Sequence, residues 1–459
     1  MKWQSPGSQF DRRCAVLKSN PGAIPAETRT IEMDESDRVF RKVAWRIMPF
    51  LFLIFVLAMV DRINIGYAKL QFSQDLAFSD TVYGMGAGVF FIGYLLSDIP
   101  SNMLLHRIGA RATISRIMIL WGIISGSMMF ISSPTQFYTF RFALGLAEGG
   151  LFPGVLLYLT YWFPANLRAK MVALSLAAIP VSGTIGAPLS GYLLDSMHNV
   201  SGLRGWQWMF LIEGIPSVIV GVVAYFFLQN SPQKAKWLTA NEKQIVADTL
   251  AFDISRPEFD KSRVSMRHAL ASPIFLVLVI LQVIGGVANS GFSFWLPQII
   301  HDLGVTNLRV NGVITSIPYI CAGLGMYLWG YSSDRNRERR WHYATASIIG
   351  AIGLMITCTH THQVNVAIAG LSLAYVGTLS CTCVFWAYTT AYLKSNAAVI
   401  GIAFINSVAA LVAYGSLSAF GAIRAATHST TLGLYAIAGL MFFAAPLVLC
   451  LPKHVQQEN

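Results

Sequence analysis

The segment IMPFLFLIFVLAMVDRINIGYA, residues 47–68, is an apolar run that contains two adjacent full charges. A helix of about 20 apolar residues crosses the hydrocarbon core of a bilayer, so this run is long enough to span a membrane. Asp61 and Arg62 each cost about 2.5–3.5 kcal/mol at that depth. A chain carries such a cost where the charges pair, face water, or meet an ion or a substrate. The segment therefore predicts a membrane helix that handles something charged.

Composition places the whole chain in the membrane. Hydrophobic residues make up 54% of the sequence and charged residues only 12%, whereas about 25% of a soluble domain is charged. The six cysteines show no CxxC spacing, which argues against a metal or disulfide framework. The sequence also lacks a phosphate-binding loop and a dinucleotide-binding glycine motif. We therefore expect no enzyme activity, no catalytic residue, no metal and no cofactor.

Apolar runs of bilayer-spanning length recur along the chain. They lie near residues 47–68, 82–105, 112–132, 137–160, 170–194, 207–228, 273–298, 310–331, 342–360, 364–391, 398–424 and 430–451. The polar stretch 229–272 separates the first six runs from the last six. The sequence thus predicts an all-α membrane protein with twelve transmembrane helices in two pseudo-symmetric six-helix bundles, 46–228 and 273–451. Residues 1–45 and 452–459 are expected to be tails.

The distribution of positive charge predicts the orientation. Roughly the first 35 residues are expected to form a disordered cytoplasmic tail, followed by a short amphipathic lead-in, DRVFRKVAWR, at residues 37–46. Basic residues gather in this tail, in the linker 229–272 and in the loops 106–111 and 335–340. Such segments lie on the cytoplasmic side by the positive-inside rule. We therefore expect a multi-pass protein of the cell membrane with both termini cytoplasmic, and the net charge of +11 requires no nucleic acid.

The two halves show a weak internal sequence similarity. The second run leads into HRIGAR, residues 106–111, and the eighth leads into GYSSDRNRERRWH, residues 330–342. Each puts small or polar residues and then basic residues at the same relative place. Paired six-span halves of this kind are typical of secondary transporters, which bind their substrate near the midplane between the halves.

Local motifs make the prediction more specific. They are MVDRINIGYAKLQF (59–72), FFIGYLLSDIPSNMLLHRIGAR (90–111), RFALGLAEGGLFPGVLLYLTYWFP (141–164), GWQWMFLIEGIP (205–216), FWLPQII (294–300), SSDRNRERRWH (332–342) and GIAFINS (401–407). In these motifs the chain resembles the anion:cation symporter family of the major facilitator superfamily. Within that family it looks most like bacterial proton-coupled carriers of organic acids, such as 4-hydroxyphenylacetate, phthalate and tartrate carriers.

The resemblance implies roles for the charged residues within the spans. It implies that Arg62 faces the central cavity and binds a substrate carboxylate, and that Glu148 couples transport to protons. Neighbouring residues on a helix point about 100° apart, so Asp61 and Arg62 cannot both face the cavity. With Arg62 placed there by the resemblance, Asp61 is expected to turn toward the fourth span and to exchange a proton. Helix direction places Arg141 at a similar height to Asp61, which makes an Asp61–Arg141 ion pair plausible. We favour a structural or gating role for Arg141 over direct substrate binding, and structural ion pairs remain the alternative for all these residues.

Other polar and aromatic residues are candidates for the substrate pocket. Tyr67 follows Arg62 by a few residues, and Tyr94 lies in the middle of the second span. Trp386 and Asn406 match positions where the family contacts its substrate. Trp386 could stack on an aromatic acid or simply pack.

Charged residues near helix ends allow structural interpretations. Asp98 and Arg116 are expected to form a latch or a structural pair near the inner ends of the second and third spans. Glu213 is expected to be structural. Asp334 and Arg335, with Arg339 and Arg340 nearby, either hold the inward-closed arrangement together or set the topology.

The sequence therefore predicts a secondary active transporter that imports a small organic anion, a carboxylate that could be an aromatic or hydroxy acid, together with protons. It is expected to act by alternating access as a monomer in the lipid bilayer. The alternatives are a proton-driven exporter of metabolites or drugs, which Arg62 argues against, and a non-transporting membrane sensor. A sensor should carry a large soluble output domain, and the polar stretches here are short.

Overall fold

The computed structural model describes residues 26–254, 272–393 and 396–452. The expectations of a disordered first tail, for residues 1–25, and of a second tail, for residues 453–459, lie outside this part of the chain. For residues 26–35 the expectation of disorder is wrong, because they are helical. Within it, twelve helical segments are long and apolar enough to span a membrane. The predicted all-α class and the predicted number of spans are confirmed.

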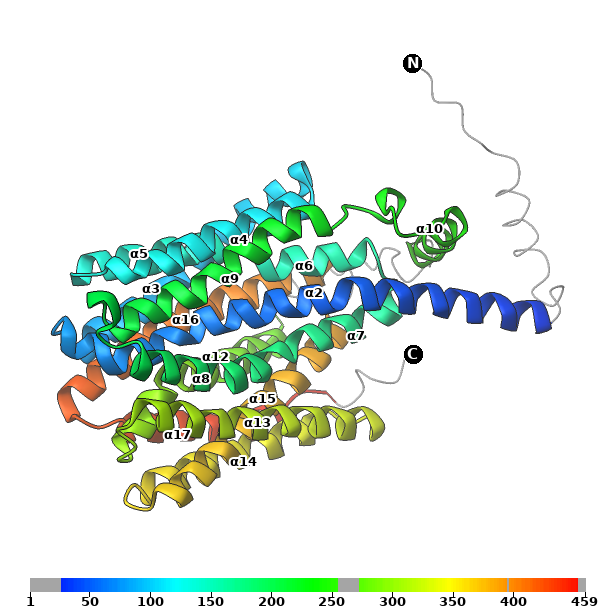
Figure 1. The fold of residues 1–459 in the computed structure, drawn as a ribbon. Coiled ribbons are helices and arrows are strands. Elements are labelled where there is room, and N and C mark those ends of the chain that lie inside the picture. The colour runs from blue at the N-terminus through cyan, green and yellow to red at the C-terminus, as the bar shows by residue number, and fades with distance from the viewer. Residues whose placement is uncertain (1–25, 255–271, 394–395, 453–459) are drawn as a thin grey trace.

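The first half begins with one very long helix and contains two spans that are broken in the middle (Figure 1). Its helices are α2 (Ala26–Asp75), α3 (Asp80–Ile108), α4 (Ala110–Ser127), α5 (Pro134–Glu148), α6 (Leu151–Thr160), α7 (Ala165–Leu176), α8 (Ala178–Ser196) and α9 (Gly205–Phe227). The helices α5 and α6 form one span, as do α7 and α8. The break after α5 falls at Gly149 and Gly150, and Gly150 has a φ of 87°, which glycine adopts without strain.

The second half has one helix for each span. Its helices are α12 (Pro273–Asp302), α13 (Leu308–Arg335), α14 (Arg340–Thr359), α15 (Val364–Tyr392), α16 (Asn396–Thr427) and α17 (Thr431–Leu449). Several of the helices start at side-chain caps. Ser79, Ser272 and Asn307 accept hydrogen bonds from the backbone N–H groups of the first turn, which would otherwise lack partners.

The expected short lead-in at residues 37–46 is instead part of α2, which continues without a break into the first span. Val39, Phe40 and Val43 are buried, and the ring of Phe40 lies 6.5 Å from that of Phe163. The segment is helical as part of the span and packs against the protein, because its apolar residues have a partner surface.

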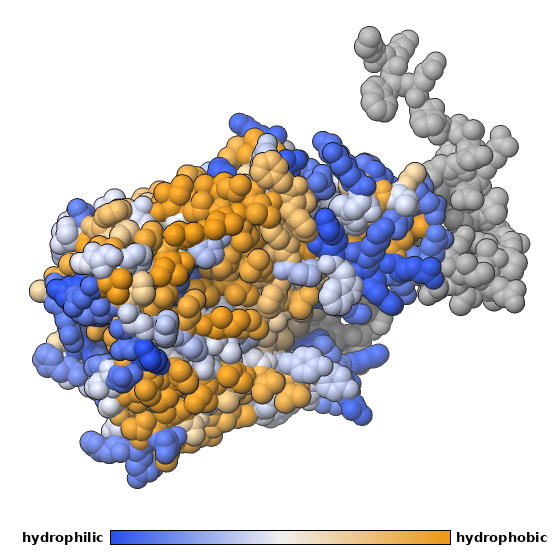
Figure 2. Space-filling view, in the orientation of Figure 1, coloured by the Kyte–Doolittle hydropathy of each residue, from blue (hydrophilic) through white to orange (hydrophobic). Residues whose placement is uncertain are grey.

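The helix α10 (Ala240–Ile254) lies at the end of the bundle where α2 begins (Figure 1). We call this end the linker end and the opposite end the distal end. The amino group of Lys42 pairs with Glu242 of α10 at 2.8 Å, and Arg168 lies 3.9 Å from Asp253. Figure 2 shows an apolar band around the middle of the bundle, with hydrophilic residues toward both ends.

The two halves meet through close backbone contacts toward the distal end. A Cβ atom on Gly84 of α3 would lie 2.5 Å from the carbonyl oxygen of Leu417 in α16. A Cβ atom on Gly191 of α8 would likewise lie 2.5 Å from the carbonyl oxygen of Leu308 in α13. Small residues let membrane helices approach this closely. The two contacts occupy corresponding places in the two halves, so the interface is itself pseudo-symmetric.

Candidate functional site

Arg62 and Glu148 form an ion pair in the middle of the first half. An Nη2 hydrogen of Arg62, on α2, is donated to Oε1 of Glu148, the last residue of α5. The carboxylate is almost fully buried, whereas the arginine side chain is 23% exposed. A buried carboxylate needs such a partner, because its isolated charge would be costly in a medium of low dielectric constant. The fourth span therefore contacts Arg62 through Glu148.

Phe90 of α3 lies between two guanidinium groups. Its ring centroid is 5.4 Å from Cζ of Arg62 and 5.0 Å from Cζ of Arg141. The ring of Tyr94, one turn along the same helix, lies 5.8 Å from Cζ of Arg62. Cations are attracted to the faces of aromatic rings at such distances. Two positive groups are thus held near each other by aromatic contacts.

Arg141 is fully buried without a carboxylate partner. Its Nε donates to the carbonyl of Gly86 at 3.3 Å, and its Nη2 donates to that of Ala87 at 3.4 Å. Its Nη1 has no hydrogen-bond partner. Phe294, from α12 of the second half, lies 5.8 Å from Cζ. Among the described residues no acidic side chain forms an ion pair with Arg141.

Asp61 points away from both arginines. Its carboxylate accepts hydrogen bonds from Ser125 of α4 at 3.0 Å and Ser217 of α9 at 2.8 Å, with Asn64 of α2 at 3.4 Å. The predicted Asp61–Arg141 ion pair is wrong, and so is the prediction that Asp61 turns toward the fourth span. The rotation of α2 directs Arg62 toward α5 and its neighbour Asp61 toward α4 and α9. The predicted divergence of the two side chains is confirmed.

Glu213 is a third buried carboxyl group in this half. It is one turn before Ser217 on α9, and its Oε1 accepts a hydrogen bond from Ser190 at 2.7 Å. Its Oε2 has no hydrogen-bond partner. In the described part of the chain, neither Glu213 nor Asp61 has a cation within ion-pair distance. Ser125, Ser190 and Ser217 were not singled out from the sequence, because serines are common in spans and only helix rotation brings them to the carboxyl groups.

The structure brings only part of the predicted pocket together. Tyr94 contacts Arg62 as described above, whereas Tyr67 is fully buried and its hydroxyl lacks a hydrogen-bond partner. Trp386 and Asn406 are half-buried on α15 and α16 of the second half. The ring of Trp386 packs on that of Phe385, with centroids 5.3 Å apart. The sequence analysis did not identify Phe90, which here contacts both arginines.

The predicted Asp98–Arg116 pair is wrong. The Oδ1 of Asp98 accepts a hydrogen bond from Asn102 at 3.3 Å, and Nη2 of Arg116 donates to Ser101 at 3.2 Å. Each side chain forms its hydrogen bond with a residue of α3 rather than with the other.

The predicted basic cluster of the second half is formed in part. Asp334 pairs with Arg339 at 2.5 Å, and Arg340 donates to the carbonyl of Leu449 at 2.6 Å. Arg335 is exposed and has no ion pair among the described residues. The turn between α13 and α14 brings Arg339, rather than Arg335, back to the carboxylate.

Four charged residues join the halves at the distal end. We call them the distal cluster: Lys69 of α2, Asp80 of α3, Asp302 of α12 and Arg424 of α16. Lys69 lies 2.8 Å from Asp80, and Arg424 pairs both with Asp80 and, at 2.9 Å, with Asp302. Lys69 also donates to Gln298 of α12 at 2.6 Å. The two cations and two anions balance each other.

Further contacts across the halves surround the distal cluster. Arg309 of α13 pairs with Asp195 of α8 at 3.0 Å. The hydroxyl of Tyr83 donates to the carbonyl of Phe294 at 2.6 Å, and its ring lies 4.9 Å from that of Trp295. Sequence analysis missed this region, because its members lie singly at the ends of different helices.

Comparisons with known proteins agree with the fold. A family model described as the Major Facilitator Superfamily matches residues 50–416. The chain is 43% identical to an Agrobacterium vitis protein named as a candidate tartrate transporter, over 94% of this chain and 96% of that one. It is 34% identical to a quinolone resistance transporter of Acinetobacter baumannii, over 93% and 98%. The crystal structure of a D-xylose–proton symporter matches with a TM-score of 0.71 at 15% identity, covering 89% and 98%.

Proposed function

Because this chain belongs to the Major Facilitator Superfamily and is a membrane transporter rather than an enzyme, we propose that it imports a small organic anion together with protons by alternating access. The observation that carries the proposal is the arrangement around Arg62. This half-buried guanidinium is paired with Glu148. A second guanidinium, Arg141, contacts the same ring, Phe90, and forms no ion pair among the described residues.

The ion pair provides a physical basis for coupling. A substrate carboxylate and Glu148 compete for the same guanidinium, whose forked donors suit either group. When Glu148 takes up a proton, Arg62 loses its partner and becomes free to bind the anion. Proton and anion therefore favour each other's binding, as symport requires. Asp61 is the second proposed proton site, because its buried carboxyl group is held by neutral donors alone.

The proposed substrate class rests on the chemistry of the side chains around Arg62. Arg62 and Tyr94 offer a charged and an aromatic contact from the first half, and we propose that Trp386 and Asn406 contribute from the second. A small carboxylate, such as a hydroxy acid or an aromatic acid, suits this set. The tartrate named for the relative is one member of that class.

The distal cluster is proposed to close the transporter on one side. By the positive-inside rule the linker end faces the cytoplasm, so the distal end faces outward. Import then requires the distal cluster to separate and re-form during each cycle. We propose that the protein works as a monomer in the cell membrane, with both termini cytoplasmic and with no cofactor other than protons.

Uptake into proteoliposomes tests the proposal. Purified protein is reconstituted, and the accumulation of radiolabelled carboxylates, beginning with tartrate, is measured with and without an inward proton gradient. We expect uptake above equilibrium only with the gradient. Anion uptake that ignores the imposed gradient would exclude symport.

A second candidate function is export of drugs or metabolites, which the similarity to a quinolone resistance transporter favours. The same vesicles distinguish the two, because an exporter exchanges its substrate against protons. Drug movement driven by a proton gradient of the opposite direction, without anion uptake, would favour export.

A further inference from the structure

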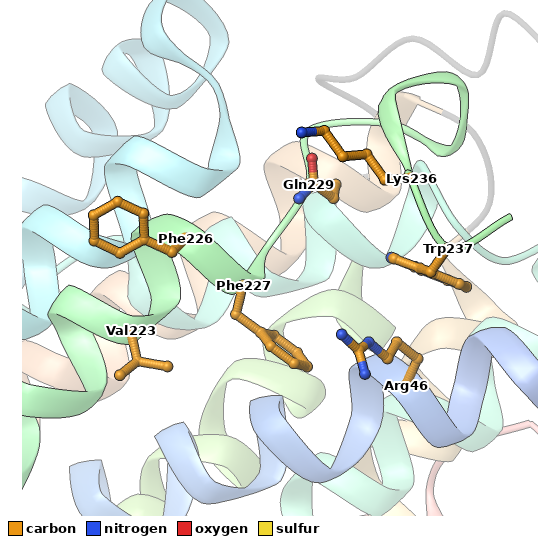
Figure 3. Close-up of a pocket in the computed structure, with 7 residues that line it drawn as sticks. All are labelled: Arg46, Val223, Phe226, Phe227, Gln229, Lys236 and Trp237. Carbon is orange, nitrogen blue, oxygen red and sulfur yellow. The ribbon is translucent and has the colours of Figure 1, made fainter.

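A groove lies at the linker end, between α2, the end of α9 and the segment that follows α9 (Figure 3). Its volume is about 480 Å³. Residues Arg46, Phe227, Lys236 and Trp237 line it on one side, and Val223 and Phe226 line it on the other. None of its lining residues forms the Arg62–Glu148 pair, and the transport cycle proposed above does not use the groove.

The groove carries two positive charges and no negative one. Arg46 and Lys236 are both exposed, and no Asp or Glu lines the groove. Neither cation forms an ion pair among the described residues. The guanidinium of Arg46 is held 4.8 Å from the ring centroid of Phe227. Two uncompensated cations that line the same groove favour an anionic ligand.

The other wall of the groove is apolar and continues into the surface that faces lipid. Ile219, Val223 and Phe226 are spaced three or four residues apart on α9, so they share one face. They are 56%, 43% and 71% exposed, as expected for side chains that contact acyl chains. An anion that binds here therefore meets both a charged and a hydrophobic wall.

The groove is preformed and lies at the level of the membrane surface. Trp237 is held in place by Trp162, with their rings stacked at 5.6 Å and an interplanar angle of 10°. Arg46 directly precedes the apolar run 47–68, and Gln229 follows the last apolar turn of α9. Tryptophan and arginine are typical of this boundary between hydrocarbon and water.

We propose that this groove binds one anionic phospholipid. Its phosphate lies between Arg46 and Lys236, its headgroup is within reach of Gln229, and one acyl chain lies along Val223 and Phe226. Basic pockets at the membrane surface bind anionic headgroups in this way. A bound lipid would fix the segment after α9 against α2, and so anchor the linker to the first half.

Native mass spectrometry of the full-length protein in detergent tests the proposal. Phosphatidylglycerol and phosphatidylcholine with the same acyl chains are titrated separately, and glycerol phosphate is used as a soluble anion. We expect the first phosphatidylglycerol to bind at least tenfold more tightly than phosphatidylcholine, and glycerol phosphate to bind much more weakly. Equal binding of the two lipids would overturn the proposal, and tight binding of glycerol phosphate would replace it with a site for a free anion.

Variants locate the lipid. Each cation near a membrane surface contributes about 1 kcal/mol, so Lys236→Gln should weaken the first phosphatidylglycerol about fivefold. The double change Arg46→Gln with Lys236→Gln should weaken it by more than tenfold. The control is Arg41→Gln with Lys234→Gln, which removes two exposed charges from the same end of the molecule. An equal loss in the control would show a diffuse charge effect and overturn the proposal.

The single variant Lys236→Gln protects the test against misfolding, because this side chain is exposed and makes no ion pair among the described residues. Its elution in size-exclusion chromatography should match that of the unmodified protein. Unchanged phosphatidylglycerol binding by this folded variant would also overturn the proposal.

Discussion

The charged residues of the distal cluster and those near the middle of the first half differ in how they are paired. In the distal cluster, Lys69 and Arg424 are matched by Asp80 and Asp302, and each charge has an opposite partner. Near the middle of the first half, the described residues form a single ion pair, Arg62 with Glu148. Arg141 is buried with two backbone carbonyls as its acceptors, and Asp61 is buried among hydroxyl and amide donors.

The difference in pairing indicates that the two regions have different roles. A balanced cluster can hold two surfaces together and can separate into water, where each charge regains hydration. A buried charge without an opposite partner is costly, and it becomes favourable when a proton or an anion arrives. Protons and substrate are therefore expected to act at the middle of the first half, and the distal cluster to respond.

Removal of Arg62 should have the largest effect. In Arg62→Ala the anion loses its proposed charged partner and Glu148 loses its cation. Loss of one member of a buried charge pair costs about 2–5 kcal/mol, so anion affinity should fall by at least about thirtyfold. Binding is measured by calorimetry on purified protein, with the carboxylate that a thermal-shift screen selects. Arg204→Ala, an exposed arginine of the distal end, serves as the control, and affinity retained in Arg62→Ala would refute the docking role.

Replacement of Glu148 should separate exchange from accumulation. Glu148→Gln imitates the protonated carboxyl group, so Arg62 stays available to the anion. We expect exchange of internal for external substrate to persist, while proton-driven accumulation falls by about tenfold or more. Both are measured in the same proteoliposomes.

Glu213→Gln is the matched comparison for Glu148→Gln, because Glu213 is also a buried carboxyl group but has no arginine partner among the described residues. If Glu213 is structural, this variant should keep its proton-driven accumulation. Loss of both exchange and accumulation in Glu148→Gln would indicate that Glu148 is itself structural.

Disruption of the distal cluster should have a smaller effect, and on conformation rather than on binding. Arg424→Ala removes the residue that joins the two acidic members of the cluster. A hydrogen bond to a charged group contributes about 1.5–3 kcal/mol, so the closed arrangement should lose stability of that order. Spin labels at the exposed residues Ser132 and Gln363, in a variant without other cysteines, should show a larger population of long distances. Arg309→Ala breaks a more exposed pair and should change the distribution less. An unchanged distribution in Arg424→Ala would exclude a closing role for the cluster.

The smallest effect is expected at the linker end. The hydrogen bond from Lys42 lowers the pKa of Glu242 below its ordinary value. A depressed carboxyl pKa stabilises the folded state above the unfolded pKa, and this contribution is lost as the pH falls through the folded pKa. Lys42→Gln should therefore lower stability by about 0.2–1 kcal/mol at neutral pH and by less in acid. Thermal unfolding at several pH values measures this, and an equal loss at all pH values would contradict it.

The sequence predicts the fold well, because bilayer thickness and composition decide it. Each of the twelve predicted apolar runs overlaps a candidate span of the structure. The main difference is at the start of α2, where the sequence predicts a separate amphipathic lead-in at 37–46, although Phe40 and Val43 are buried against the protein. Burial of these residues depends on distant segments, which local patterns do not reveal.

The sequence predicts which residues belong to the candidate site better than it predicts which residues they contact. Asp61 and Arg62 stand out because charge is rare in an apolar run, and the 100° step between neighbours predicts that they diverge. Which helix each side chain contacts depends on the rotation of α2. The fourth span is expected to contact Asp61, but it contacts Arg62 instead. The distal cluster is invisible in the sequence, since Asp80 and Arg424 are distant residues whose pairing exists only after the halves have packed.

The most direct test of the account is the number of protons taken up when the anion binds. Calorimetric titration of purified protein with the selected carboxylate, in buffers that differ in ionisation enthalpy, gives this number near neutral pH. The account predicts net proton uptake in the unmodified protein, and less uptake with retained anion affinity in Glu148→Gln. Anion binding without proton uptake, or uptake unchanged in Glu148→Gln, would contradict the claim that proton and anion exchange at Arg62.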